Sequence, residues 1–348
     1  MFNFGPPLWS PVTHVCNTGP AWAASTLPAS GKWVIGGFGQ NGVAFAMGFD
    51  PSSALLPKLA AYSTDYGQTW SAATPPVWPN HGGGVATVTT HSSAFDGRGN
   101  AVAGTTNTAV DGAVTYDGGQ NWAATVLAPA FSNTFCWFNG TNRFFSAETG
   151  QAAVQATASG NGWSQVGTLP TTPSTGSVVG ACNGNGVHII AGSNQSTYRS
   201  VDDGVTWSAG GNLPGTYVAS DIAYGLGQWV IVDGSNILQS NTHLIVSTDD
   251  GVTWSAVTVP APAPSLSAWR SITSGQGLIV VCSTSNVSGQ NSVIFTNDGV
   301  NWQSSPNQLP LVTGGGQCLW VLYSDGLGHF IGIPITSGVN QIAAYGTC

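Results

Sequence analysis

An eight-residue frame, Ser-x-Asp-x-Gly-x-x-Trp, recurs along this chain and restricts it to a repeat fold. Residues 247–254 carry it as STDDGVTW, and residues 63–70 (STDYGQTW) and 200–207 (SVDDGVTW) also fit it fully. Partial matches occur at residues 115–122 (TYDGGQNW), 295–302 (FTNDGVNW) and 156–163 (ATASGNGW). Because these copies follow one another at intervals of roughly 40 to 50 residues, we expect each to belong to one unit of a repeat architecture.

The residue types of the frame predict a tight turn followed by a buried ring. A short polar side chain can hydrogen-bond backbone groups two residues on, and glycine supplies the positive φ that a turn needs. We assign the turn-holding role to Asp65, Asp117, Asp202, Asp249 and Asn297. The buried rings are Trp70, Trp122, Trp163, Trp207, Trp254 and Trp302. An enzyme needs one catalytic constellation, so carboxylates repeated on equivalent turns indicate scaffolding, and we expect Asp203 and Asp250, at the variable position, to be solvated.

Composition excludes several classes of partner. The chain has 348 residues, of which only 6% are charged, and its net charge is −8. With six Lys and Arg in total, it is not expected to bind nucleic acid or anionic lipid. The 42% of apolar residues, with 14 Trp, can bury a large core. No apolar run is long enough for a membrane helix, and the first residues lack the pattern of a signal peptide.

The cysteine pattern gives no metal site. The six cysteines, Cys16, Cys136, Cys182, Cys282, Cys318 and Cys348, stand singly and contain no Cys-x-x-Cys pair. An even count permits disulfides, but a chain with so large a core does not need them. We therefore expect free thiols, no bound metal and no cofactor.

Strand-like runs accompany each frame and predict a β-propeller. We expect the second strand of each unit at residues 32–35, 100–103, 143–145, 187–190, 228–232, 278–281 and 329–333. Pairs of glycines precede most of these runs and indicate hairpins. A third run leads into each frame and a fourth follows its Trp. Four short antiparallel strands in a unit of about 50 residues are typical of a propeller blade.

The count of units predicts how the ring closes. There are seven second strands but six frames, and the last unit stops at residues 341–348. At the other end of the chain, Leu8-Trp9-Ser10 resembles the residues that follow the other turns. We therefore expect one domain, residues 1–348, forming an all-β, seven-bladed propeller of four-stranded antiparallel blades. In it, residues 1–13 complete the blade formed by residues 316–348, and Trp9 takes the seventh Trp position. A chance match in a Trp-rich chain is the alternative.

The repeated frame resembles the Asp-box, or bacterial-neuraminidase-repeat, β-propellers over essentially the whole chain. That group includes sialidases, other glycoside hydrolases, sorting receptors, a photosynthetic assembly factor and phage virion proteins. The resemblance implies the fold and says little about activity. It also implies that the boxes lie on peripheral hairpins, on the face away from any active site.

The residues of a sialidase are missing from the sequence. Resemblance to that class would require three arginines around a substrate carboxylate, one of them in a Phe-Arg-Ile-Pro segment, which this chain lacks. Its four arginines are Arg98, Arg143, Arg199 and Arg270, and its single glutamate is Glu148. A general glycoside hydrolase needs only two carboxylates. The carboxylates outside boxes and turns are Asp50, Asp111, Glu148, Asp221 and Asp233, and no pair has an interpretable spacing.

Binding is the function that the loops favour. The connections between blades are rich in Pro, Gly, Ser and Thr, and loops held on a rigid scaffold commonly carry recognition. Candidate ligand-binding residues in or after these loops are Trp78, His81, Tyr217, Trp269 and Arg270. Their rings suit sugars, although packing between blades is the alternative for each. We expect a non-enzymatic component of a phage virion that binds a host-surface glycan or another virion protein. The alternative is a secreted glycoside hydrolase.

Overall fold

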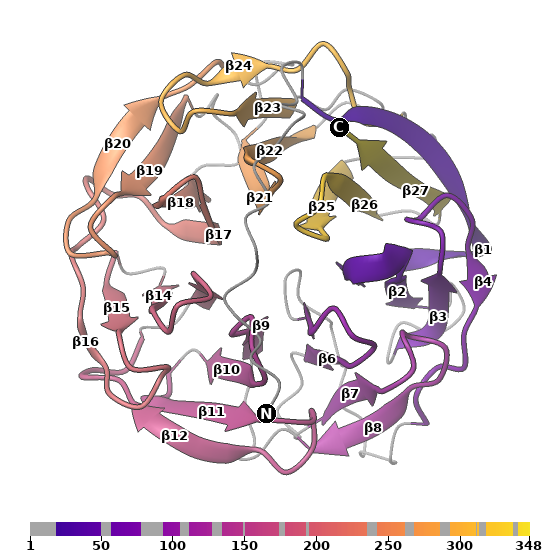
Figure 1. Ribbon diagram of the computed structural model, residues 1–348, viewed down its shortest axis with the longest axis horizontal. Helices are drawn as coiled ribbons and strands as arrows, with labels where there is room; N and C mark the ends of the chain where they lie inside the picture. The colour runs from indigo at the N-terminus through magenta and orange to yellow at the C-terminus, as the bar shows by residue number, and fades with distance from the viewer. Residues whose placement is uncertain are drawn as a thin grey trace, which may run out of the picture.

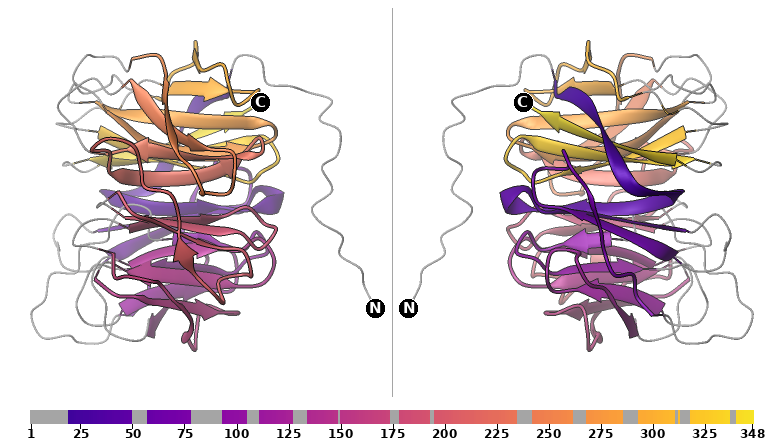
Figure 2. Two further views of the ribbon diagram at one scale, coloured as in Figure 1. Left: turned by 90° about the vertical axis from the view of Figure 1, so that its left-hand side faces the viewer. Right: turned by 90° about the vertical axis from the view of Figure 1, so that its right-hand side faces the viewer.

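The computed structural model has the predicted seven-bladed β-propeller fold (Figure 1). It describes residues 19–49, 57–77, 93–104, 111–126, 134–148, 150–173, 178–192, 195–234, 242–261, 268–285, 293–310, 312, 318–336 and 340–348. The described strands form seven antiparallel units arranged radially, and each strand runs between the two faces of the ring (Figure 2). The one helix among these residues is the 3-10 turn η1 (Gln40–Gly42), and no described helix could span a membrane.

The strands follow the chain order of the blades, from the axis outwards. Blade 1 contains the second part of β1 (Ala21–Phe38), then β2 (Ala44–Phe49), β3 (Pro57–Ser63) and β4 (Ser71–Ala72). Blade 2 contains β5 (Ser93–Phe95), β6 (Ala101–Gly104), β7 (Asp111–Thr115) and β8 (Ala123–Val126). Blade 3 contains β9 (Thr134–Phe138), β10 (Phe144–Glu148), β11 (Ala153–Thr157) and β12 (Ser164–Thr168). Blade 4 contains β13 (Val178–Cys182), β14 (His188–Gly192), β15 (Thr197–Ser200) and β16 (Ser208–Ala209).

The remaining blades follow the same order. Blade 5 contains β17 (Ala219–Gly225), β18 (Gln228–Asp233), β19 (His243–Ser247) and β20 (Ser255–Thr258). Blade 6 contains β21 (Trp269–Gly275), β22 (Leu278–Ser285), β23 (Val293–Thr296) and β24 (Gln303–Ser304). Blade 7 contains β25 (Cys318–Ser324), β26 (His329–Thr336) and β27 (Asn340–Thr347), with the first part of β1 as its outer strand.

Blade 1 corrects one predicted strand. Residues 32–35 belong to its innermost strand, and β2 is its second strand, so the second-strand prediction is wrong there. The other six predicted second strands coincide with β6, β10, β14, β18, β22 and β26. The error arose because Trp33 and Ile35 are fully buried in a long strand that serves two blades.

The ring closes through β1, but not through the predicted residues. Residues 21–26 pair antiparallel with β27, from Ala21 opposite Thr347 to Thr26 opposite Ile342. The half-buried Trp22 packs against the core cluster that contains Leu278, Phe295 and Phe330. Residues 1–13 and Trp9 lie outside the described residues, and the position predicted for them at the edge of β27 is filled by residues 21–26. Because one strand edge accepts one partner, the closing strand is reassigned to β1.

The Asp-box turns have the hydrogen bonds that their sequence predicts. In blade 1, Ser63 Oγ donates to Asp65 Oδ1 at 2.8 Å, and the Gly67 N–H donates to Ser63 Oγ at 2.9 Å. The Thr69 N–H and Oγ1–H both donate to the Asp65 carboxylate, at 2.9 and 2.6 Å. The indole N–H of Trp70 reaches Ser25 Oγ at 3.0 Å, which ties the box to the closing strand.

Blade 6 places the box carboxylate one residue later than predicted. Asp298, and not Asn297, accepts hydrogen bonds from Thr296 Oγ1 and from the N–H groups of Val300 and Asn301. In the other boxes that contain an aspartate, one residue separates it from the glycine, as in Asp249-Asp250-Gly251. Blade 6 lacks that residue, so Asp298 directly precedes Gly299. The assignment of Asn297 as the turn-holding residue is therefore wrong.

This correction yields a stability prediction. Replacing Asp298 by Ala removes the acceptor for four donors of one turn, so we expect a lower melting temperature. Replacing Asn297 by Ala leaves those bonds in place, so its effect should be smaller. Thermal unfolding followed by circular dichroism checks the order of the two variants, and the reverse order would contradict the reassignment.

The box carboxylates also predict how stability depends on pH. Hydrogen bonds from the Thr253 side chain and backbone, and then from Ser247 and Val252, lower the pKa of Asp249 from 3.8 to about 2. A pKa lowered by folding contributes stability above the unfolded value, and this contribution is lost as the pH falls through the folded value. The stability difference between the wild type and Asp249→Asn should therefore shrink between pH 4 and pH 2. Urea unfolding at several pH values measures it, and a constant difference would contradict the lowered pKa.

Asp203 and Asp250, at the variable box position, were predicted to be solvated. The structure instead gives each of them a protein partner. Asp203 Oδ1 lies 3.0 Å from Nε2 of the fully buried His188, and Asp250 Oδ1 accepts the indole N–H of Trp229 at 3.1 Å. The indole N–H of Trp137 donates to His188 Nδ1 at 3.0 Å. Burial lowers the pKa of His188, so this imidazole is held neutral between blades 3 and 4.

The cysteines also depart from the prediction in one case. Cys136, Cys182 and Cys282 are free thiols, as expected, and burial raises the pKa of Cys136 to about 12 and that of Cys182 to about 11. Cys348, in contrast, is disulfide-bonded. Its partner is a cysteine whose side chain lies outside the described ones. The two buried thiols with raised pKa values are poor nucleophiles at neutral pH.

Candidate functional site

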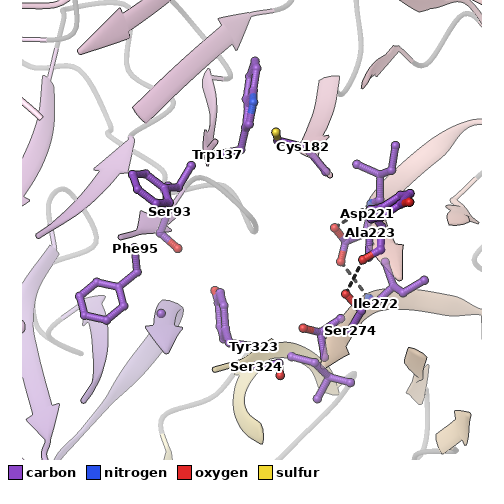
Figure 3. A pocket seen from close by; sticks show the side chains of 18 of the residues that line it. Ser93, Phe95, Trp137, Cys182, Asp221, Ala223, Ile272, Ser274, Tyr323 and Ser324 are labelled. Carbon is purple, nitrogen blue, oxygen red and sulfur yellow. Dashed lines mark hydrogen bonds between the residues drawn. The ribbon is translucent and has the colours of Figure 1, made fainter. Parts of the chain in front are cut away.

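The innermost strands of all seven blades surround a cavity of about 360 Å³ on the ring axis (Figure 3). In an antiparallel pair, alternate residues direct their backbone groups away from the partner strand. The hairpin bonds from the N–H of Asn139 to Arg143 O and from the N–H of Asn183 to Val187 O fix this alternation in blades 3 and 4. Each inner strand therefore turns two residues' N–H and C=O groups toward the axis.

These inward positions form two tiers, with one residue from each blade in each tier. The deeper tier is Gly36, Ser93, Cys136, Gly180, Ile222, Ile272 and Leu322. The tier nearer the box turns is Phe38, Phe95, Phe138, Cys182, Tyr224, Ser274 and Ser324. All of these residues except Gly36 line the cavity. The site is therefore built from strand edges, whose backbone groups need partners.

In the deeper tier, side chains already satisfy the inward N–H groups of blades 5, 6 and 7. The buried carboxylate of Asp221 accepts the N–H groups of Ile222 and Ile272, both at 2.9 Å. Ser271 Oγ donates to the same carboxylate at 3.1 Å and accepts the N–H of Leu322, also at 3.1 Å. This chain of bonds crosses three blades. Figure 3 shows Asp221 and Ile272, two of its members, at the cavity.

Tyr323, in β25 of blade 7, satisfies the inward N–H group of the neighbouring blade 1 and so completes this half of the wall. Its hydroxyl oxygen accepts the N–H of Gly36 at 2.9 Å. Burial, with a smaller contribution from the negative charge of Asp221, raises the pKa of Tyr323 to about 12. The phenol is therefore neutral over the physiological pH range, and it acts as a fixed hydrogen-bonding group.

The opposite half of the wall differs in chemistry. Among the described residues, the inward N–H groups of Ser93, Cys136 and Gly180 have no protein acceptor. The same three blades present the half-buried rings of Phe95 and Phe138 at the second tier. This half offers hydrogen-bond donors beside aromatic surface, an arrangement that suits a neutral ligand with acceptor oxygens and an apolar face.

The described part of the cavity wall carries fewer carboxylates than glycoside hydrolysis uses. Glycoside hydrolysis uses two carboxyl groups about 5 to 9.5 Å apart. Among the described residues that line the cavity, Asp221 is the single carboxylate, and three donors hold it. The side chains of Asp111 and Glu148, and all of Asp50, lie outside the described part of the chain. Asp233 accepts the N–H of Val218 at 3.0 Å, near the ends of the strands opposite the boxes.

Of the predicted ligand-binding residues, the three that the structure describes, Tyr217, Trp269 and Arg270, do not line the cavity. Trp78 and His81 lie outside the described residues. Trp269 is fully buried within the core cluster of blades 5 and 6, so its predicted role as an accessible ring is wrong. The pairing of β21 with β22 is irregular next to this residue, between Trp269 and Ser271.

Tyr217 and Arg270 lie at the ends of strands opposite the box turns. The ring of Tyr217 lies 6.0 Å from that of His243, with an angle of 32° between their planes. Burial lowers the pKa of Arg270, and the charge of Asp233 opposes that shift. The sequence-based prediction missed the cavity itself. The sequence feature that could have indicated the cavity is Asp221, a carboxylate in the middle of a predominantly uncharged strand.

Comparisons with known proteins agree with this geometry at the level of motif and fold. Residues 61–72 match the BNR/Asp-box repeat model. A structure of YCF48 bound to D1 peptide has a TM-score of 0.64 at 13% identity, covering 97% of this chain and 99% of that one. YCF48 from Cyanidioschyzon merolae gives 0.63 at 13% identity, covering 94% and 98%.

A glycoside hydrolase has a similar fold but a longer chain. The GH74 xyloglucanase from Xanthomonas campestris has a TM-score of 0.62 at 14% identity, and the match covers 92% of this chain and 53% of the xyloglucanase. No curated protein sequence matches this chain. At these identities the similarities establish the fold and leave the activity open.

Proposed function

This chain is an Asp-box β-propeller, and we propose that it is a non-enzymatic binding protein that holds its ligand in the axial cavity. The observation that carries the proposal is the asymmetry of the cavity wall. In the deeper tier, Asp221, Ser271 and Tyr323 accept the inward N–H groups of one half, whereas the N–H groups of Ser93, Cys136 and Gly180 in the other half face the cavity. Donors of this kind are satisfied by acceptor oxygens of a ligand or by water.

The ligand that fits this wall is a neutral, oxygen-rich molecule. Its acceptor oxygens would take the three backbone N–H groups, and its apolar face would contact Phe95 and Phe138. Sugar rings have both features, and so does the backbone of a peptide. The similarity to a propeller that binds a peptide supports a protein partner as the second form of this ligand.

The finer part of the proposal concerns where the protein acts. We place it on a virus particle, as a tail, fibre or capsid-attached propeller that binds a host-surface glycan or another virion protein. The support is the composition, in which 6% of residues are charged and hydroxyl and amide groups form most of the polar surface. A secreted glycoside hydrolase is the alternative, and it would need a second carboxylate at the cavity.

One experiment separates binding from hydrolysis. The full chain is applied to an oligosaccharide array, and reducing-end release is measured on each sugar that binds. We expect binding without release, and we expect Phe138→Leu to weaken it about tenfold because the ring contact is lost. The exposed Val77→Ala serves as the control. Release of reducing ends would overturn the non-enzymatic assignment, and unchanged affinity of Phe138→Leu would overturn the cavity as the site.

A further inference from the structure

Four exposed valines lie on the box turns of three consecutive blades. Val201 and Val205 in blade 4 are 58% and 53% exposed, Val252 in blade 5 is 51% exposed and Val300 in blade 6 is 78% exposed. We call these four residues the valine arc. Tight turns ordinarily carry Gly, Pro, Asn, Asp and Ser at such positions. A row of exposed β-branched side chains therefore needs a reason other than the turn itself.

Three of these valines occupy one equivalent position, directly after the box glycine. Blades 1 and 2 have glutamine there, at Gln68 and Gln120, and both are exposed. The turn therefore folds with a polar residue at this position, and the box does not require valine. At this position, valine occurs in the neighbouring blades 4, 5 and 6.

The valine arc lies on the opposite face from Tyr217 and Asp233. The N–H of Asp203 in the box turn donates to Gly186 O in the hairpin between β13 and β14 at 3.0 Å, so both turns share one face. The turns between β15 and β16, β19 and β20, and β23 and β24 follow one another around the rim of the ring (Figure 1). The valine arc therefore lies on the box turns of three successive blades, on the rim of the ring and not among the residues that line the cavity.

Carboxylates surround the valine arc. The three turns, residues 200–207, 247–254 and 296–302, contain five aspartates: Asp202, Asp203, Asp249, Asp250 and Asp298. One cation contacts them, because Arg199 Nε donates to Asp250 O at 2.9 Å, so the aspartates outnumber it five to one. In Asp202, burial alone would raise the pKa, but the hydrogen bonds from Thr206 and Ser200 lower it overall. Hydrogen bonds also lower the pKa values of Asp249 and Asp298. These groups are ionised at neutral pH, so the apolar arc is embedded in negative charge.

We propose that this face of blades 4 to 6 docks a partner protein whose apolar side chains are flanked by Lys and Arg. Charge complementarity selects this occupant. A second copy of the same face would bring five aspartates against five, and the whole chain has only six Lys and Arg. The proposal adds a second surface to the protein and does not depend on a ligand in the axial cavity.

The test uses synthetic peptides as probes and a substitution that the fold already tolerates. Three labelled peptides of alternating Leu and Lys, Ser and Lys, and Leu and Glu are titrated with the full chain by fluorescence anisotropy. We expect the Leu/Lys peptide to bind most tightly and to weaken as salt is added. In the triple variant Val205→Gln, Val252→Gln, Val300→Gln, its affinity should fall at least tenfold.

The controls make each result decisive. Glutamine stands at the same position in blades 1 and 2, so the triple variant should melt at the wild-type temperature. Val77→Gln replaces an 87% exposed valine outside the arc and should bind like the wild type. Unchanged affinity of the triple variant, or equal binding of the Ser/Lys or Leu/Glu peptide, would overturn the proposal.

Discussion

Removal of residues 1–26 is expected to lower the melting temperature by about 10 °C or more. The truncation takes away the strand that pairs with β27 from Ala21 to Thr26, and with it the ring of Trp22. Loss of a fully buried Trp side chain costs about 3 to 5 kcal/mol, and we expect the half-buried Trp22 and the strand pairing together to cost about as much. Each kcal/mol shifts the melting temperature of a large domain by about 2 to 4 °C. The exposed edge of β27 should also promote aggregation. Circular dichroism and light scattering measure both effects.

The matched control is a truncation of residues 1–18. It keeps every residue of the strand that pairs with β27, so it should melt close to the full chain. If this shorter truncation melted as low as the longer one, the closing contact would lie upstream, where the sequence pattern placed Trp9. If both melted like the full chain, the pairing of β1 with β27 would not support the ring.

The second large effect is expected for Trp229→Ala. Trp229 is fully buried, its ring lies 5.0 Å from that of Tyr224, and its indole N–H donates to Asp250 at 3.1 Å. Loss of such a side chain leaves a cavity and an unpaired acceptor, at about 4 kcal/mol. We expect a fall of about 10 °C in the melting temperature.

A second variant at this position separates packing from hydrogen bonding. Trp229→Phe keeps an aromatic ring and loses the indole N–H, so its loss of stability should be clearly smaller than that of the alanine variant. The exposed Val77→Ala should be neutral. An alanine variant that melts within 1 °C of the wild type would contradict the packing between blades 4 and 5.

The parts of the fold that the sequence predicts well are those closed by local contacts. Each Asp-box turn closes its hydrogen bonds within eight residues, so residue types such as Ser63, Asp65 and Gly67 suffice to recognise it. Blade 6 shows the limit, because a turn shortened by one residue moves the carboxylate from position 297 to 298. The spacing to Gly299 and Trp302 favoured position 297 for the turn-holding residue, although the sequence has an aspartate at the next position, Asp298.

Ring closure depends on contacts that are distant in sequence. Two segments near the N-terminus, Leu8-Trp9-Ser10 and Ala21-Trp22-Ala23, resemble the residues that follow the boxes. The second resembles one of them, Asn121-Trp122-Ala123-Ala124, more closely than the first does. Only the ladder between β1 and β27 decides between them. The long β1, which serves blades 7 and 1, also displaced the predicted second strand of blade 1.

The cavity could not be predicted from residue types, because backbone groups form most of it. Cys136 and Gly180 contribute N–H groups whose direction depends on strand alternation. Trp269 shows a second kind of error. Its position after a loop suggested an accessible aromatic ring, but the ring is fully buried in the core, next to an irregularity in strand pairing. Motifs therefore predict the scaffold here, and strand register determines the binding wall.

Hydrogen–deuterium exchange of the intact protein tests the closed ring most directly. If residues 21–26 form the outer strand of blade 7, their amides that face β27 should exchange as slowly as those of β26. Peptides covering residues 21–26 and residues 329–336 can be compared in one digest. Exchange of the first peptide at the rate of a loop, with the second still protected, would contradict the closed seven-bladed ring.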